Sequence, residues 1–274
     1  MPHVVALYRY PVKGFAPESL DTLTVQTDGR IAGDRVLAFR FAAAATPEDQ
    51  DGLDYWPKSK GLALESFPGL AALRLAYDDA TARVRIEHDG ETLVEGGLDE
   101  DGRAAIIEAL TAFVLSSPEG KRLARPGRLP LAFVGDGVRS RFQDRSRGYV
   151  SVHSRASVGA LSTALKQTID DRRFRSNVVV DGVEAWGELG WEGEVRIGDV
   201  RFAAAGPIVR CLATHANPDS GARDAKVLTT LTGRLGQREP TLGRLLILPG
   251  VSGMVGDESG IGGTIRVADE VVIG

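Results

Sequence analysis

Cys211 is the single cysteine of this 274-residue chain, and the residues around it favour a reactive thiol. The stretch reads Gly-Pro-Ile-Val-Arg-Cys-Leu-Ala-Thr over residues 206–214 and follows an apolar segment that we expect to be a strand. The neighbouring Arg210 favours the thiolate, which can act as a nucleophile or as a soft metal ligand. A free cysteine can equally be a small buried apolar side chain, so this segment alone leaves both interpretations open. One cysteine excludes an internal disulfide, a cysteine-ligated zinc site and an iron–sulfur cluster held by this chain alone.

Three further stretches place a cation beside turn-forming residues. They are residues 10–14 (Tyr-Pro-Val-Lys-Gly), 33–35 (Gly-Asp-Arg) and 172–177 (Arg-Arg-Phe-Arg-Ser-Asn). Lysine and arginine near exposed backbone can hold a phosphate, and arginine does so through two parallel N–H donors. Any one of these stretches is more simply a solvated basic segment. The three together with Cys211 form a more specific set.

The familiar catalytic motifs are missing from the sequence. It contains no Walker loop, no His-Glu-x-x-His, no Gly-x-Ser-x-Gly and no Gly-x-Gly-x-x-Gly that opens a helix after a strand, which disfavours common hydrolases and dehydrogenases. The four histidines, His3, His88, His153 and His215, are far apart and show no local spacing for a zinc or iron site. Only His153 and His215 lie near the stretches described above.

The charge balance limits the partners of the protein. Lys and Arg total 33 against 37 Asp and Glu, a net charge of -4, so the chain has no overall basic field for nucleic acid or anionic membrane. Any anion site must therefore be local. The apolar runs are short, the first residues pass directly into an expected strand, and we expect a cytoplasmic protein without a membrane span.

The elements that must position these residues are mostly strands. With 33 Gly and 13 Pro, many short alternating runs predict a mainly β (α+β) fold. Residues 81–95 and 191–205 show the hairpin pattern most clearly. Helical spacing appears from about residue 101 to 117, around 158–165 and over 225–235, and we expect these helices to cover barrel ends. Polar, turn-rich loops are expected at 46–52 and 117–120.

In this order and spacing, the sequence resembles the MOSC-domain proteins with an N-terminal β-barrel partner, which include the mitochondrial amidoxime-reducing component and its bacterial relatives. Residues 10–13 match the family's Tyr-Pro-Val-Lys, 33–35 its Asp-Arg turn, and 174–180 its Phe-Arg-Pro-Asn-Ile-Val segment, with Ser176 in place of the proline. Residues 210–214 match its Arg-Cys-x-x-Thr, and residues 217–221 its Asp-Pro-x-Thr-Gly. The resemblance covers nearly the whole chain.

The resemblance implies two β-barrel-like domains with a few covering helices, and a molybdenum–pterin cofactor (molybdopterin). It divides the chain into residues 1–122, an N-terminal β-barrel region, and 123–274, the MOSC domain, with residues 1–38 packing against the second. It assigns Cys211 as the catalytic metal ligand. It assigns cofactor binding to Lys13, Gly14, Arg35, His153, Ser154, Arg175, Asn177 and Arg210. Pyridoxal phosphate is a further binding property associated with the family.

The implied activity is reduction of N-hydroxylated compounds, such as amidoximes, by a molybdenum-cofactor oxidoreductase with a separate electron-donor protein. The proton donor is open among His215, Asp219 and an ordered water. Two alternatives use the same residues differently: a sulfur carrier or sulfurtransferase with a Cys211 persulfide, and a non-catalytic cofactor carrier. All three require Lys13 and Arg35 to lie beside Arg175 and Cys211, although more than 130 residues separate the two pairs.

Overall fold

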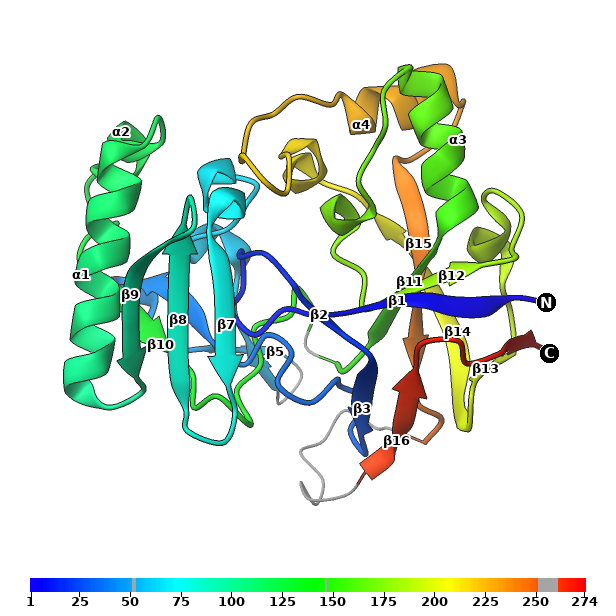
Figure 1. Ribbon diagram of the computed structural model, residues 1–274, viewed down its shortest axis with the longest axis horizontal. Coiled ribbons are helices and arrows are strands. Elements are labelled where there is room, and N and C mark those ends of the chain that lie inside the picture. Colours follow the sequence, from blue (N-terminus) through cyan, green and yellow to red (C-terminus); the bar gives the residue numbers. More distant parts are fainter. Residues whose placement is uncertain (51–52, 146, 251–260) are drawn as a thin grey trace.

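The computed structural model describes residues 1–50, 53–145, 147–250 and 261–274 (Figure 1). Its largest element is an eight-stranded mixed sheet in the order β17-β13-β14-β15-β11-β12-β1-β2. The strands are β1 (His3–Arg9), β2 (Glu18–Leu20), β11 (Val150–Ser154), β12 (Val178–Asp181), β13 (Glu194–Ile197), β14 (Val200–Val209), β15 (Thr241–Ile247) and β17 (Val271–Ile273). Within this sheet β11 and β12 run parallel, and the remaining neighbours whose register is given run antiparallel.

The centre of this sheet is buried on both sides. Val178, Val179 and Val180 of β12 are all fully buried, and a continuous run of β-branched residues is typical of an internal strand. β12 pairs with β1 on one side and with β11 on the other. The segments that lead into and out of β12 are therefore held at fixed positions.

The remaining strands form smaller sheets. β3 (Thr22–Gln26) pairs with β16 (Ile261–Arg266), β4 (Ala38–Phe41) with β10 (Leu131–Val134), and β5 (Glu48–Gln50) with β6 (Leu53–Tyr55). β7 (Arg74–Asp78), β8 (Arg83–His88) and β9 (Glu91–Gly97) form an antiparallel sheet that lies beside α1 in Figure 1.

The helices are few, and the two longest begin at side-chain caps. α1 (Glu100–Ser116) starts after Asp99, whose side chain accepts a hydrogen bond from the Gly102 N–H, and α2 (Gly120–Leu123) follows it. α3 (Arg155–Leu165) starts after Ser154, and α4 (Val227–Thr229) continues into a π-helical turn (Thr230–Arg234). Short 3-10 turns are η1 (Ala42–Ala44), η2 (Lys58–Lys60), η3 (Pro68–Ala72), η4 (Asp171–Phe174), η5 (Gly187–Gly190) and η6 (Leu212–His215). No helix in the described ranges combines the length and apolar character needed to cross a bilayer.

The first strands belong to the C-terminal sheet. β1 pairs with β12, and β3 pairs with β16 near the C-terminus, so residues 3–26 pack with strands more than 150 positions away. Two large apolar cores result. One surrounds Leu37, Phe39 and Leu110, and the other surrounds Leu7, Val178 and Phe202. The division of the chain at residues 122 and 123 stays a prediction.

The structure confirms the mainly β fold with few helices. Both expected hairpins form, as β8-β9 and β13-β14, and all three helical segments contain helix. The expected loop at 46–52 is wrong in part, because residues 48–50 form β5, a short exposed strand paired with β6. Residues 51–52 of that loop lie outside the described residues.

Candidate active site

A cavity of about 700 Å³ gathers most of the residues that the sequence singled out. Lys13, Gly14, Arg35, Arg175, Asn177, Arg210 and Cys211 all line it. They come from four separate parts of the chain: the segment after β1, the turn before β4 that carries Arg35, the segment before β12, and the segment after β14. Backbone hydrogen bonds from Arg35 to Tyr10 and from Lys13 to Leu37 join the first two of these parts. The pairing of β1 with β12 brings the segment before β12 to the segment after β1, and the pairing of β14 with β15 positions the segment after β14.

The cavity is strongly basic although the protein as a whole is acidic. Eight lysine and arginine residues line it, against two carboxylates, Asp144 and Glu65. Cations gathered in a concave site raise the local concentration of anions far above its bulk value. The cavity thus supplies, locally, the positive charge for an anion that a chain with a net charge of -4 lacks overall.

Tyr10 is a platform for two of the arginines. Its ring is fully buried, and the guanidinium carbons of Arg35 and Arg175 lie 4.8 Å and 4.3 Å from the ring centre. Arg35 also forms an ion pair with Asp34 and donates a hydrogen bond of 3.0 Å to the Arg175 carbonyl. Arg175 in turn donates a hydrogen bond to the Phe15 carbonyl. Burial lowers the pKa of Arg175 to about 10, helped by the like charge of Arg35.

Both arginines have left-handed backbone conformations. The φ angle is +55° at Arg35 and +53° at Arg175, a region that costs a residue with a side chain on the order of 1 kcal/mol. The two strained positions place two cations at one cavity. Strain at a ligand site is retained where the surrounding structure over-determines it.

Lys13 approaches the cavity from another wall. Its side chain is largely buried, and the ammonium lies 2.9 Å from the Asp144 carboxylate. Burial lowers the pKa of Lys13. Although burial alone would raise it, the pKa of Asp144 is held below its ordinary value by Lys13, Arg35 and Lys58. Gly14 follows with a φ of +91°, and a Cβ there would lie 3.2 Å from the Leu62 carbonyl oxygen, so glycine allows this close turn.

Arg210 and Cys211 form the third wall. The Arg210 guanidinium donates to the carbonyls of Leu242 (2.7 Å) and Phe174 (2.6 Å), but its buried Nη2 has no hydrogen-bond partner among the residues that the structure describes. Burial lowers the pKa of Arg210 to about 10, so it stays charged at neutral pH. Cys211 is half-buried, in extended backbone where β14 ends and η6 begins.

Asn177 lies at the cavity, but its amide is already engaged. Its Oδ1 accepts hydrogen bonds from the Ser151 hydroxyl (2.8 Å) and the Ser151 N–H (3.3 Å), and its Nδ2 donates to the Tyr8 carbonyl (3.3 Å). These contacts join β11 and β1 to the segment that opens β12. The side chain of Asn177 therefore stabilises the base of the cavity.

Two of the expected cofactor residues lie away from the cavity. Ser154 is fully buried, and its hydroxyl accepts from the Ala156 N–H, so it is the N-cap of α3. His153 is fully buried beside the Phe174 ring, with 5.7 Å between ring centres. Neither residue is among those that line the cavity, whereas Phe174, the ring beside His153, is. Their assignment to cofactor binding stays a prediction from the family resemblance.

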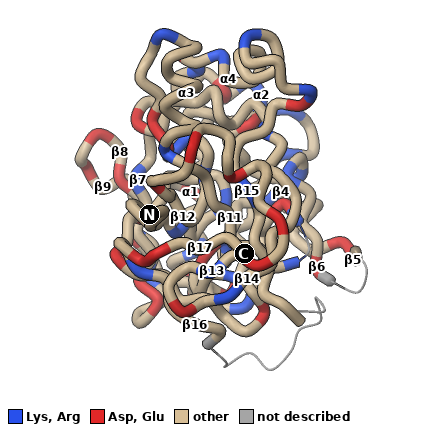
Figure 2. The backbone as a smooth tube through the Cα atoms, turned by 90° about the vertical axis from the view of Figure 1, so that its right-hand side faces the viewer, with Lys and Arg blue, Asp and Glu red and all other residues tan. Residues whose placement is uncertain are grey.

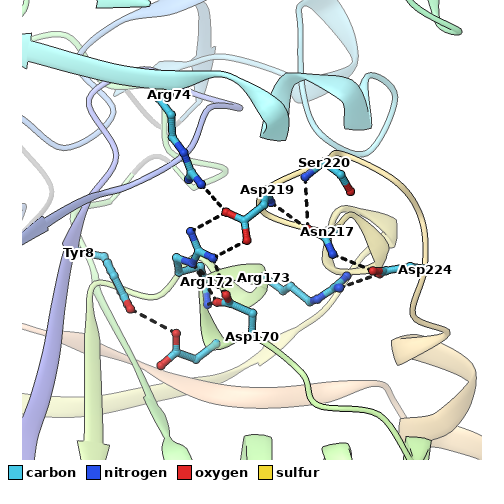
Figure 3. A network of polar contacts seen from close by, with 10 residues as sticks. Tyr8, Arg74, Asp170, Arg172, Arg173, Asn217, Asp219, Ser220 and Asp224 are labelled. Carbon is cyan, nitrogen blue, oxygen red and sulfur yellow. Dashed lines mark hydrogen bonds and ion pairs between the residues drawn. The ribbon is translucent and has the colours of Figure 1, made fainter. Parts of the chain in front are cut away.

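The two side chains considered as proton donors also lie off the cavity wall. His215 accepts a hydrogen bond from the Leu228 N–H through Nε2. Asp219 accepts from both Nη atoms of Arg172, at 3.1 Å and 3.0 Å, and also pairs with Arg74 of β7 (Figure 3). These contacts join η4 to the sheet of β7-β8-β9.

Several residues that line the cavity belong to none of the motifs identified in the sequence. Lys58 pairs with Glu65 at 2.7 Å, and its pKa is raised by Glu65 and Cys211 in spite of partial burial. Arg145 and Arg147 line the cavity as exposed side chains. The four arginines within residues 139–147 are the signal that could have revealed this wall. Within the described ranges, no group of three or more His, Cys, Asp or Glu side chains could hold a metal ion.

Comparison with known proteins adds a domain and named relatives. Residues 139–272 match the MOSC domain. The chain is 37% identical over 75 residues to mitochondrial amidoxime-reducing component 1 of Mus musculus, covering 27% of this chain and 22% of that protein. It is 30% identical over 130 residues to the Homo sapiens protein of the same name, covering 44% of this chain and 35% of that one.

A second group of relatives has a different name. The chain is 31% identical over 116 residues to molybdenum cofactor sulfurase of Drosophila pseudoobscura pseudoobscura, covering 42% of this chain and 14% of that protein. The matches thus span at most about a third of these relatives. Among solved structures, the YuaD protein of Bacillus subtilis aligns over 99% of this chain and 94% of that one, with 11% identity and a TM-score of 0.40. The domain and the named relatives support a function associated with the molybdenum cofactor.

Proposed function

Since residues 139–272 form a MOSC domain, we propose that this protein binds a molybdenum–pterin cofactor in the basic cavity and reduces N-hydroxylated compounds such as amidoximes. One observation carries the proposal. Cys211 shares a single cavity with Lys13, Arg35, Arg175 and Arg210, which come from distant parts of the chain. A thiol among four cations suits a ligand that carries both a soft metal and a phosphate.

The residues present fit such a ligand. The cavity volume of about 700 Å³ lies within the range of cofactor and ligand pockets. The buried Nη2 of Arg210 has no partner among the described residues, and a buried donor of this kind is costly until a ligand satisfies it. Six more cations than carboxylates line the walls, which matches an anionic cofactor better than a neutral one.

We assign the roles by position and chemistry. Lys13, Arg35 and Arg175 would hold the phosphate and pterin through charge-assisted hydrogen bonds, and Tyr10 would keep the two guanidiniums in place. Cys211 would ligate the molybdenum as a thiolate, next to the positive charge of Arg210. Pyridoxal phosphate binding stays a prediction from the family resemblance.

The reaction determines what else the site must receive. Reduction of an amidoxime breaks the N–O bond, consumes two electrons and two protons, and releases an amidine and water. The bound cofactor supplies the two-electron chemistry, and the chain supplies orientation and charge. Among the wall residues without a role in holding the cofactor, Tyr55, Tyr149 and Lys58 carry a transferable proton. The electrons come from a separate donor protein.

The test is to purify the protein from a host that makes the cofactor and to measure its molybdenum, its pterin and its reduction of benzamidoxime by reduced methyl viologen. We expect stoichiometric cofactor and turnover. Cys211→Ser should abolish turnover and change the metal content, whereas Ser220→Ala, a change outside the cavity, should leave both unchanged. A folded protein without pterin in this host would refute the proposal.

Sulfur transfer is the second candidate, since a second group of relatives is named molybdenum cofactor sulfurase and Cys211 is a half-buried free thiol. Here Cys211 would carry a persulfide instead of ligating the metal. Mass spectrometry of the intact protein separates the two candidates. A sulfur adduct that is absent from Cys211→Ser, on a protein without molybdenum, would favour sulfur transfer.

A further inference from the structure

A second groove, of about 590 Å³, lies directly behind one wall of the cavity. Glu65 lines the cavity and the next residue, Ser66, lines the groove, so a single segment of chain separates them. The other walls are α2 with the residues after it, and the loop at 220–223. That loop lies tightly against η3, because a Cβ on Gly221 would come within 2.6 Å of the Pro68 carbonyl oxygen. Figure 1 shows this loop, before α4, reaching toward the helical turns near β7.

The groove is basic, and three of its four cations have no partner among the described residues; the fourth, Arg223, donates a hydrogen bond to the Glu65 carbonyl. Lys121, Arg122, Arg125 and Arg223 line it, with Glu119 as the single carboxylate among the lining residues. The side chains of Lys121, Arg122 and Arg125 are exposed and make no hydrogen bond or ion pair with any residue that the structure describes. In Figure 2 basic residues recur at the end of the molecule that carries α2, α3 and α4.

These like charges repel one another. Burial and the neighbouring charges of Arg125 and Arg122 lower the pKa of Arg128, which follows them in the chain. Unpaired like charges cost the isolated protein stability and speed the approach of a partner of opposite charge. An acidic protein surface has the complementary charge and the size to cover an open groove, and the adjacent cavity gives such a partner a reason to dock here.

We propose that this groove is the docking surface for an acidic face of the electron-donor protein. The inference rests on the function proposed above. The donor is a carrier protein with a flavin, haem or iron–sulfur group. It is oxidised as it delivers the two electrons, while the two protons come from water and the N–O bond of the substrate is broken. A donor in the groove is separated from the cavity by the segment of Glu65 and Ser66.

The test uses the cofactor-loaded protein and flavodoxin, a small acidic flavin protein, as the probe. Binding is measured by fluorescence anisotropy at low and at high salt. The variant Lys121→Glu/Arg122→Glu/Arg125→Glu should weaken binding about tenfold or more at low salt and flatten its salt dependence. The matched control Arg201→Glu/Lys226→Glu/Arg238→Glu changes the net charge equally at exposed positions outside the groove, and should weaken binding less than about twofold.

A second measurement separates docking from the chemistry. Reduced methyl viologen is too small to need a docking surface, so viologen-driven reduction of benzamidoxime should be equal in the wild type and both triple variants, while flavodoxin-driven reduction should fall only in the groove variant. Equal effects of both triples, no effect of the groove triple, or tight binding of inorganic phosphate in the groove would each overturn the docking proposal. Absence of viologen-driven turnover in the wild type would instead overturn the proposed function.

Discussion

The guanidinium of Arg175 lies 4.3 Å from the centre of the Tyr10 ring, and Arg35 lies over the same ring at 4.8 Å. Tyr10 belongs to the first strand region and Arg175 to the segment before β12, so this contact joins two parts of the chain at the point where both meet the cavity. Two like charges are thereby held side by side. The aromatic ring that they share offsets part of their repulsion.

Replacing Tyr10 tests this platform. Tyr10→Phe keeps the ring and loses a hydrogen bond of 3.4 Å to the Ser176 carbonyl, so we expect it to cost at most about 1 kcal/mol. Tyr10→Leu removes the ring and should cost about 2–4 kcal/mol and weaken cofactor retention. Urea unfolding measures the loss of stability in both variants, and pterin content after gel filtration measures cofactor retention. Equal pterin retention in Tyr10→Phe and Tyr10→Leu would contradict the platform role.

Two substitutions of Arg175 test whether its left-handed backbone conformation is strained. Arg175→Gly and Arg175→Ala both remove the guanidinium, but only glycine relieves the backbone at φ +53°. We expect Arg175→Gly to be more stable than Arg175→Ala by about 1 kcal/mol, and both to lose cofactor. Parallel urea titrations give the difference. If alanine matches or exceeds glycine in stability, the left-handed position carries no strain.

The sequence predicts a residue's place in the site well when that residue belongs to a short motif. It predicts it poorly when tertiary packing decides whether the side chain reaches the cavity. Cys211, Lys13 and Arg35 lie in local turn motifs, and the structure gathers them at one cavity. His153 differs, because it is fully buried beside Phe174, a residue 21 positions later in the chain, and is not among the residues that line the cavity. No local pattern in β11 reports which ring will cover it.

The basic groove also cannot be predicted from the sequence. Lys121 and Arg223 lie about one hundred residues apart in the chain, and each alone is an ordinary exposed cation. They share a groove because the loop at 220–223 packs on η3, a contact that requires glycine at position 221. Composition gives the net charge of the chain, but only the fold gives its distribution.

Asn177 should act on stability more than on cofactor binding. Its amide satisfies the Ser151 N–H and hydroxyl and the Tyr8 carbonyl inside the core. Asn177→Ala removes these three hydrogen bonds and should cost about 3 kcal/mol, since a buried group left unsatisfied costs roughly 1–3 kcal/mol. The measurement is the urea midpoint at pH 7. Arg35→Ala provides the comparison, because it should lose cofactor with a smaller loss of stability. The reverse order would show that the Asn177 amide serves the ligand.

His153 should make the protein sensitive to acid. Complete burial, with the charges of Arg210 and Arg155, lowers its pKa from 6.5 to about 3. Because the unfolded chain binds a proton near pH 6.5 and the folded protein does not, stability rises with pH between about 3 and 6.5. From pH 7 to pH 5 this one residue should therefore cost about 2 kcal/mol.

The variant His153→Leu removes this proton uptake and fills the site with an apolar side chain. Neither ring nitrogen of His153 has a hydrogen-bond partner in the part of the chain that the structure describes, so the replacement leaves no polar group unpaired and should be nearly neutral at pH 7. At pH 5 it should be more stable than the wild type by about 2 kcal/mol, measured by urea unfolding at both values. His3→Gln, a change at an exposed histidine, should keep the wild-type pH dependence. A His153→Leu protein that loses stability in parallel with the wild type would show that the buried imidazole is not the group that titrates.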